Sequence, residues 1–538
     1  MEAFVIVLIL SMLFCLPCYS TIHRLIQLPF KLPTKDRREK RKLPPGPPAL
    51  ISLVMLPFLS LKRASDLNSI IGKLRRRYGP IVTVYLDPSS PTIIVTGREL
   101  IREALVEKGA TFAARPSRGI EPGPIPIVAA ISAATYGSTW RLLRQTLASG
   151  IFHPSYVRSL TSARQWALGI VKEKLECKSR LGNGIVEVRD ALQCAMLSLL
   201  GLLCYGKKLE DDLIDDIKVA HNQIASIYDE LSFDFLAMLG DFFFGTRSRA
   251  LQDIRRKHEE VFVPLIRARR AHKNQQLHQK ELPHQQPQEY VHDTTVNSYV
   301  DSLLDLRLPE EKNRELDDTE IMVACYELLG SAAAQVPTIV EWTIANLVKN
   351  PCTQEKLQEE IQRVMQEEGS AGSSELKEES LEKMEYLNAV VLESLRMHPP
   401  AHLLLTHSVL TEVSLGGYVI PKDANVLFMA GEVGYDESVW SKPSEFRPER
   451  FLPGGEGERV DLTGRRELKM MPFSLGRRTC PSTSFSIPLV KYLVANMVKE
   501  FKWESAHGDD VDMLDKFGLV VTMHTPLQVR ISPRVLSV

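Results

Sequence analysis

The sequence lacks both a net charge and a disulfide pattern. Among its 538 residues, 66 lysines and arginines balance 66 aspartates and glutamates, which gives no reason to expect nucleic acid as a partner. Wide scatter of cysteines in a long chain excludes a disulfide framework. It indicates free thiols in a reducing environment that faces the cytosol. The eight cysteines are Cys15, Cys18, Cys177, Cys194, Cys204, Cys325, Cys352 and Cys480.

The sequence also lacks an internal repeat, a phosphate-binding loop of the P-loop type and a glycine-rich dinucleotide fingerprint. These absences exclude the usual ways of binding a nucleotide cofactor directly. If the protein is a redox enzyme, its electrons therefore come from another protein.

One long apolar run stands at the N-terminus. Residues 3–19 are uncharged and about as long as the shortest membrane span. A basic cluster follows between residues 31 and 42, and positive charge after a span holds that side in the cytosol. A cleaved signal peptide would carry its charge before the apolar run. We therefore predict a transmembrane signal anchor at 1–22, a basic and proline-rich linker at 23–49, and one large domain at 50–538.

The large domain reads as mainly helical. Two short strands are expected within residues 79–97, and polar loops at 274–293 and 367–375. A long helix is predicted from the capping-box-like start at 317–320 to Lys349. A second helical segment, 380–400, ends at two prolines and carries Glu393 and Arg396 on one face.

The loop "PFSLGRRTCPSTS", residues 472–484, places Cys480 beside two arginines. A basic neighbourhood favours the thiolate, which is the form that acts as nucleophile or metal ligand. Taken alone, the loop is better explained by an incidental surface cysteine, so its context has to decide between the two readings.

Several motifs occur in a fixed order along the chain: an N-terminal anchor, "PPGPP", "WRLLR" at 140–144, "ESLR" at 393–396, "FRPERF" at 446–451 and "FSLGRRTC" at 473–480. Together they resemble the cytochrome P450 family of haem-thiolate monooxygenases, especially its plant microsomal members, over essentially the whole chain. The resemblance implies a mainly α fold with a small β-rich lobe, preceded by one transmembrane helix.

The resemblance also implies roles for individual residues. Cys480 would be the thiolate ligand of the haem iron, in a loop whose pattern Phe473, Gly476 and Arg478 match. The residues implied to contact the haem propionates are Arg478, Trp140, Arg144 and His407. The triad of Glu393, Arg396 and Arg450 is implied to be structural.

The sequence departs from the family at two places. Ser482 replaces the glycine that follows the ligand cysteine, and we expect this small residue to be tolerated. In the long helix, Ala334 and Gln335 stand where the family has an acid and a threonine that relay protons during oxygen activation. The Gln335 amide and the Ser331 hydroxyl can still donate, and Pro337 is expected to open the helix nearby.

Three functions remain open on the sequence. The first is a monooxygenase that uses O2, electrons from an NADPH-dependent cytochrome P450 reductase and a small apolar substrate, at the endoplasmic reticulum membrane with its catalytic domain facing the cytosol. The second is a haem-thiolate isomerase or dehydratase acting on a peroxide. The third is a haem-binding protein of low activity. Apolar stretches at 122–132, 401–405 and 517–520 are the candidates for lining a substrate pocket.

Overall fold

The structure is a computed structural model that describes residues 43–49, 52, 64–87, 90–116, 130–233, 246–281, 297–369, 376–506, 508 and 511–534. The predicted transmembrane helix at 1–22, the linker up to residue 42, and residues 122–129 of the first apolar stretch lie outside this part. Most of the predicted loop at 367–375 and residues 282–293 of the other loop also lie outside it.

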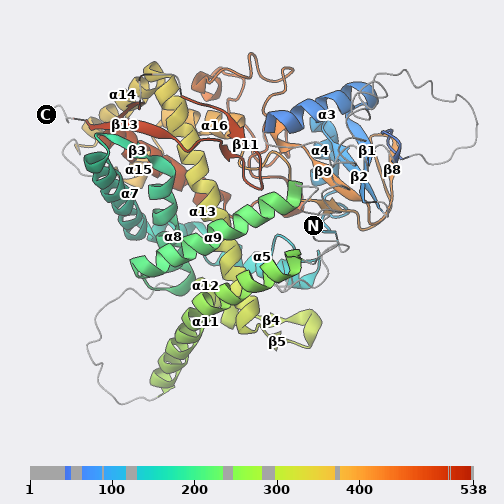
Figure 1. The fold of residues 1–538 in the computed structure, drawn as a ribbon, viewed down its shortest axis with the longest axis horizontal. Helices are drawn as coiled ribbons and strands as arrows, with labels where there is room; N and C mark the ends of the chain where they lie inside the picture. Colours follow the sequence, from blue (N-terminus) through green and yellow to red (C-terminus); the bar gives the residue numbers. More distant parts are fainter. Residues whose placement is uncertain are drawn as a thin grey trace, which may run out of the picture. The chain divides into compact units, whose positions relative to one another are not determined.

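Helix α13, Asp318–Lys349, is the central element, as predicted from its capping box (Figure 1). Asp317 accepts a hydrogen bond from the backbone N–H of Glu320, and the Glu320 carboxylate accepts one from the N–H of Asp317. Helices α8 (Val188–Tyr205), α16 (Glu385–Met397) and α18 (Thr483–Glu500) pack against it. Burial on nearly all sides explains why α13 reads as apolar all round.

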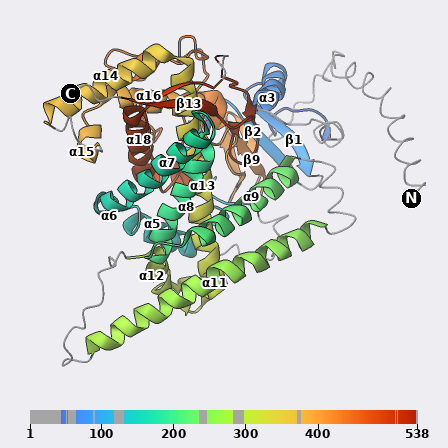
Figure 2. The same ribbon diagram turned by 60° about the vertical axis from the view of Figure 1, so that its left-hand side comes forward.

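The remaining helices surround this centre. Figure 2 shows α11 running its full length along the outside of the helical part. The bounds are α3 Ala64–Tyr78, α4 Arg98–Arg102, α5 Ser138–Ser149, α6 Pro154–Ser159, α7 Thr161–Leu181, α9 Asp211–Phe233, α11 Thr246–Glu281, α12 Tyr299–Leu304, α14 Pro351–Glu367, α15 Glu378–Leu381 and α17 Ala430–Val433. One short segment is a π-helix, η2 Glu103–Glu107. Three short segments are 3-10 helices: η4 Pro309–Glu311, η5 Pro448–Phe451 and η6 Gly476–Arg478.

Two helix predictions need correction. The segment predicted as a loop from residue 274 is helical as far as Glu281, because its glutamines, leucine and lysine are good helix formers and the first proline is Pro283. The segment 380–400 is divided into α15 and α16. The Glu360 carboxylate of α14 accepts hydrogen bonds from the N–H groups of Tyr386 and Leu387, both at 2.8 Å, and so starts a new helix there.

The β-rich lobe confirms the two predicted strands. β1 (Ile81–Asp87) and β2 (Ser90–Val95) form an antiparallel pair. β2 pairs in parallel with β9 (Asn425–Phe428), which lies beside it in Figure 1. β9 also pairs with β6 (His407–Ser408), giving the order β1-β2-β9-β6. Smaller sheets are β10-β13-β3, β11-β12, β4-β5 and β7-β8, with bounds β3 Ile185–Glu187, β4 Arg307–Leu308, β5 Arg314–Glu315, β7 Val413–Leu415, β8 Tyr418–Ile420, β10 Phe501–Ser505, β11 Asp515–Lys516, β12 Thr522–Met523 and β13 Gln528–Pro533.

The end of the proline-rich segment packs on this lobe. Thr83 of β1 donates from its N–H to the carbonyl of Pro45 and from its hydroxyl to that of Pro44. Gly46 lies so close that a Cβ there would be 1.8 Å from the Thr83 carbonyl oxygen. Residues 44–46 are therefore attached to the body of the protein.

Within the described residues, two helices are long and apolar enough to cross a membrane, α8 and α13, and both are mostly buried inside the protein. They read as core helices of the domain.

Candidate active site

The loop before α18 brings Cys480 to the inside of the protein. Gly476 has φ +67°, and a Cβ there would lie 1.8 Å from the Leu105 carbonyl oxygen, so only glycine fits. The Cys480 N–H donates to the Phe473 carbonyl at 2.8 Å and closes the loop. Cys480 is half-buried and free.

The Cys480 sulfur is the first atom in a chain of two polar contacts with serine hydroxyl groups. The Ser482 Oγ lies 3.1 Å from the Cys480 Sγ, and the Ser486 Oγ lies 3.1 Å from the Ser482 Oγ. Ser482 has φ −98°, an ordinary value for any residue, so its backbone does not need the glycine that the family has here.

Arg478 reaches back from this loop to a segment far away in the sequence. Its guanidinium donates to three backbone carbonyls, those of Ala113 at 2.8 Å, Ile131 at 2.9 Å and Ala134 at 2.7 Å. It also lies over the ring of Trp140, 4.7 Å from the centroid. The Trp140 Nε1 donates to the same Ile131 carbonyl, so Trp140 and Arg478, each implied to contact a propionate, meet at one place.

A further arginine in this cluster was missed from the sequence. Arg115 donates to the carbonyls of Ser132 at 2.6 Å, Leu405 at 2.8 Å and Thr406 at 3.0 Å. It thereby ties the segment before α5 to the segment before β6. A lone arginine in the apolar stretch "TFAARP" is the signal that could have indicated it.

The cluster carries more positive than negative charge. Burial and the neighbouring Arg478 lower the pKa of Arg115 to about 9, and burial and Arg144 lower the pKa of Arg478 to about 10. Burial also lowers the pKa of Arg144, which the Cys480 sulfur partly offsets. Glu327 of α13 is the described carboxylate that acts on Arg115 and Arg478. Three guanidinium groups against one carboxylate leave room for a ligand with two negative charges, and the two propionates of a haem fit this surplus.

Glu327 was also missed from the sequence. Its carboxylate accepts hydrogen bonds from the backbone N–H groups of Ile131 at 2.6 Å and Ser132 at 2.7 Å. Burial raises its pKa more than these bonds and Arg115 lower it. An acid inside an otherwise apolar helix was the available signal.

His407 is buried at the start of β6. Its Nδ1 lies 2.6 Å from the Phe112 carbonyl, so the ring holds a hydrogen on Nδ1. Burial and then Arg115 lower the pKa of His407 to about 3, which makes the ring neutral and leaves Nε2 as an acceptor. In this state the ring presents no donor to a carboxylate.

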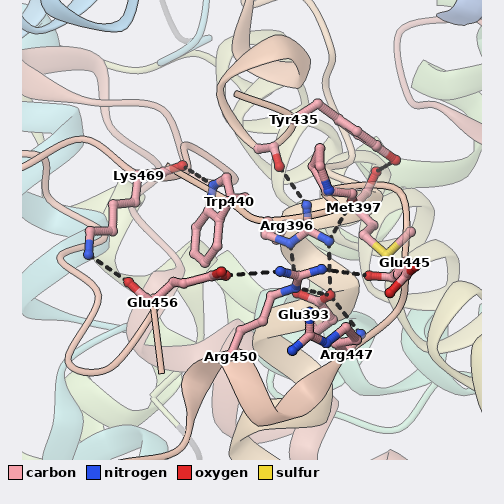
Figure 3. Close-up of polar contacts among 12 residues, drawn as sticks. Glu393, Arg396, Met397, Tyr435, Trp440, Glu445, Arg447, Arg450, Glu456 and Lys469 are labelled. Carbon is pink, nitrogen blue, oxygen red and sulfur yellow. Dashed lines mark hydrogen bonds and ion pairs between the residues drawn. The ribbon is translucent and has the colours of Figure 1, made fainter. Parts of the chain in front are cut away.

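The triad of Glu393, Arg396 and Arg450 is assembled as the motif suggests (Figure 3). The Glu393 carboxylate accepts from Arg396 Nε at 2.7 Å and from Arg450 Nε at 3.1 Å, and all three side chains are almost fully buried. Arg396 also donates to the carbonyls of Gly434 and Pro443. Arg450 reaches a second carboxylate, that of Glu456, at 2.9 Å.

The altered part of α13 is the least covered stretch of that helix. Ser331 is exposed, and Ala334 and Gln335 are half-buried, although the residues before and after this stretch are buried. The helix continues through Pro337, so the expected opening does not interrupt it. The Thr338 hydroxyl donates to the Ala334 carbonyl at 2.8 Å, whereas the carbonyl that Pro337 leaves without a helical N–H is that of Ala333.

Two of the predicted apolar stretches are neighbours. The N–H of Val521 donates to the Pro400 carbonyl at 2.8 Å, which brings 517–520 beside 401–405. Leu404 and Phe517 are buried, whereas Leu405 and Leu519 are exposed.

Comparison with known proteins places this arrangement in a family. Residues 44–531 match the family model "Cytochrome P450". The chain is 36% identical to Cytochrome P450 89A9 of Arabidopsis thaliana, over 92% of this chain and 94% of that protein, and 29% identical to Alstonine synthase of Alstonia scholaris, over 92% of each. A solved zebra fish cytochrome P450 with abiraterone shares the fold, with a TM-score of 0.66 and 20% identity, covering 87% of this chain and 100% of that one. The chain therefore belongs to the cytochrome P450 family, whose members are monooxygenases.

Proposed function

We propose that this protein is a haem-thiolate monooxygenase that inserts one oxygen atom from O2 into a small apolar substrate. Its electrons would come from NADPH through a cytochrome P450 reductase, since the sequence contains no nucleotide-binding fingerprint of its own. The observation that carries the proposal is the cluster of Arg478, Arg115 and Arg144, which has a surplus of positive charge and in which Arg144 lies close enough to Cys480 to feel its sulfur.

The chain's residues would divide the binding of the haem between them. Cys480 would bind the iron, and Arg478, Arg144 and Trp140 would hold the propionates. His407 would donate from Nε2 only when its ring is protonated, a state that a nearby propionate favours. The haem would supply the binding and activation of O2. Glu393, Arg396 and Arg450 would keep the surrounding loops in place without contacting it.

The Cys480 assignment is tested by the ferrous carbon monoxide spectrum. Cys480→Ala should abolish the thiolate-type Soret band, whereas Cys352→Ala, which removes an exposed thiol, should keep it. A thiolate band that survives in Cys480→Ala would overturn the assignment.

Turnover that needs reductase and NADPH supports the monooxygenase, and turnover of a hydroperoxide without NADPH supports the isomerase or dehydratase.

The proton relay is the weakest match to the family. Gln335 and the exposed Ser331 hydroxyl would take over part of the work of the missing acid and threonine, and general acid catalysis is typically worth about 10²–10⁴-fold. If the relay is impaired, the enzyme should release more hydrogen peroxide per NADPH than product, and Ala334→Asp with Gln335→Thr should improve coupling. Tight coupling in the native enzyme, lost in the double variant, would show that Gln335 and Ser331 already form a working relay.

The proposed location is the endoplasmic reticulum membrane, with residues 1–22 as a single span and the catalytic body in the cytosol. The apolar run and the basic cluster in the sequence support this proposal. Deleting residues 1–42 should release much of the protein from membranes while it still binds haem. A truncated protein that is soluble but free of haem would contradict the linker assignment.

A further inference from the structure

Ser482 does not use its side chain as its position suggests. It is the residue before the first turn of α18, where a serine side chain usually accepts a hydrogen bond from a backbone N–H of that turn. No such capping bond is formed. The hydroxyl lies instead between the Cys480 sulfur and the Ser486 hydroxyl, at 3.1 Å from each. The side chain that replaces the family's glycine thus contacts the sulfur expected to bind iron.

The direction of these bonds follows from the chemistry of the sulfur. A thiolate has no hydrogen, so in the haem-bound protein the Ser482 hydroxyl must be the donor. Its oxygen is then free to accept from the Ser486 hydroxyl, one helical turn further along α18. Ser486 is 6% exposed, so water competes little for this bond. Consecutive hydrogen bonds of this kind polarise and strengthen one another.

We propose that Ser482 donates a hydrogen bond to the Cys480 thiolate and, supported by Ser486, raises the reduction potential of the bound iron. The inference rests on the proposed binding of haem iron by Cys480. A donor to the sulfur withdraws electron density from the iron and stabilises the reduced state, in which the sulfur carries more negative charge. Ser482 is therefore a positioning and tuning residue that acts through Cys480, and it makes the first electron easier to accept.

The test is a reduction potential measured on the haem-loaded protein. Ser482→Ala removes only the hydroxyl and should shift the one-electron equilibrium towards the oxidised state by about tenfold, or about 59 mV. The iron–sulfur stretching frequency should rise, because the sulfur then donates more strongly to the iron. Ser486→Ala should shift both quantities in the same direction by less, and Ser482→Thr, which keeps a hydroxyl, should restore them.

Ser484 provides the matched control. Its hydroxyl bonds to the Phe152 carbonyl at 3.2 Å, and Ser484→Ala removes a serine hydroxyl from the same turn of α18 without removing a contact to Cys480. It should leave the potential and the stretching frequency unchanged. If Ser482→Ala fails to fold, Ser482→Gly restores the family's residue and should give the same shift.

The possible outcomes distinguish the hydrogen bond from Ser482 from the underlying ligation of iron by Cys480. A thiolate-type carbon monoxide band in every variant, together with potentials of Ser482→Ala and Ser486→Ala equal to the wild type, would overturn the hydrogen bond and leave the Cys480 ligation standing. A wild-type protein that binds haem without a thiolate band would overturn both. A graded fall in potential from Ser486→Ala to Ser482→Ala, absent in Ser484→Ala, supports the inference.

Discussion

Two groups of arginines in this protein are built from the same side chain but donate to different kinds of acceptor. In the triad, Arg396 and Arg450 share the Glu393 carboxylate, and Arg450 also reaches Glu456. In the cluster beside Cys480, Arg478 and Arg115 donate to backbone carbonyls, which carry no full charge.

The difference shows how to tell a structural arginine from one that awaits a ligand. Pairing with carboxylates completes the charge balance inside the protein, so the triad needs nothing further. Carbonyl partners satisfy hydrogen bonds but leave the charge uncompensated. Burial lowers the pKa values of Arg115 and Arg478, and so does a neighbouring arginine, which is Arg478 for Arg115 and Arg144 for Arg478. Arg478 is buried like the triad arginines, and Arg115 is half-buried. The clearer distinction between the two groups is the identity of their acceptors.

The largest effect is expected from breaking the triad at its shared carboxylate. Glu393→Gln leaves two buried guanidinium groups without their common charge, and breaking a buried ion pair typically costs about 3–5 kcal/mol. Urea unfolding followed by circular dichroism should show this loss with and without haem. A variant as stable as the wild type would show that Glu456 and the backbone carbonyls suffice.

The second prediction separates the two arginine groups directly. Arg478→Gln should weaken haem binding by about tenfold, or about 1.4 kcal/mol, because a charged partner of the propionates is lost. Its haem-free stability should fall less than that of Arg450→Gln, since removing Arg478 also relieves repulsion. Haem transfer to an acceptor protein measures the first quantity, and urea unfolding of the apoprotein the second. Equal losses of apoprotein stability in the two variants would contradict the comparison.

The third prediction concerns pH and the single carboxylate of the cluster. Since burial raises the pKa of Glu327 above its ordinary value of 4.5, the folded protein holds this proton more tightly than the unfolded chain. The stability of the wild type relative to Glu327→Gln should therefore rise as the pH falls through the raised folded pKa towards 4.5. Unfolding free energies of the wild type and Glu327→Gln, measured at pH 8 and at pH 5, should show this rise.

Glu456 gives a control of opposite sign. Burial acts to raise its pKa, but hydrogen bonds from Ser441 and Arg450 hold that pKa below its ordinary value of 4.5. The wild type should therefore be more stable than Glu456→Gln above pH 4.5, and this difference in unfolding free energy should decline as the pH falls below 4.5. The same trend in both variants would show that neither carboxylate controls the pH dependence.

The smallest effect is expected at the surface. Lys356 and Glu449 form an ion pair at 2.9 Å, with both side chains well exposed. Glu449→Gln should cost no more than about 0.5 kcal/mol, and added salt should shrink the difference. A loss comparable to that of Glu393→Gln would mean that burial is not what gives the triad its strength.

Short sequence patterns correctly predicted those elements whose position depends mainly on neighbouring residues. The capping box at Asp317 and Glu320 indicated the start of α13, and short runs rich in β-branched residues indicated β1 and β2. The end of α11 was misjudged because a polar composition suits an exposed helix as well as a loop. The continuity of α13 at Pro337 depends on packing around it, which no local pattern reports.

In the candidate active site, too, the motifs indicated some residues, while others could be found only from the fold. Its motifs indicated Cys480, Arg478 and the triad, whose geometry the structure brings together. Arg115 and Glu327 belong to no motif, and their roles follow from contacts between segments about 200 or more residues apart. Such long-range contacts are set by the whole fold, so single-residue reading could not assign them.

The pairing of β2 with β9 has a consequence for the order in which the chain can fold. Thr92 pairs with Asn425, and Gly476 sits against Leu105, so both the lobe and the Cys480 loop join ends of the domain that are synthesised far apart in time. Contacts of large sequence separation form slowly because a long loop must first be closed. Until β9 has been synthesised, the edge of β2 that will pair with it therefore has no partner strand. A ribosome stalled before residue 425 would present that edge to chaperones or to other nascent chains, and haem capture belongs to the last stage of biogenesis.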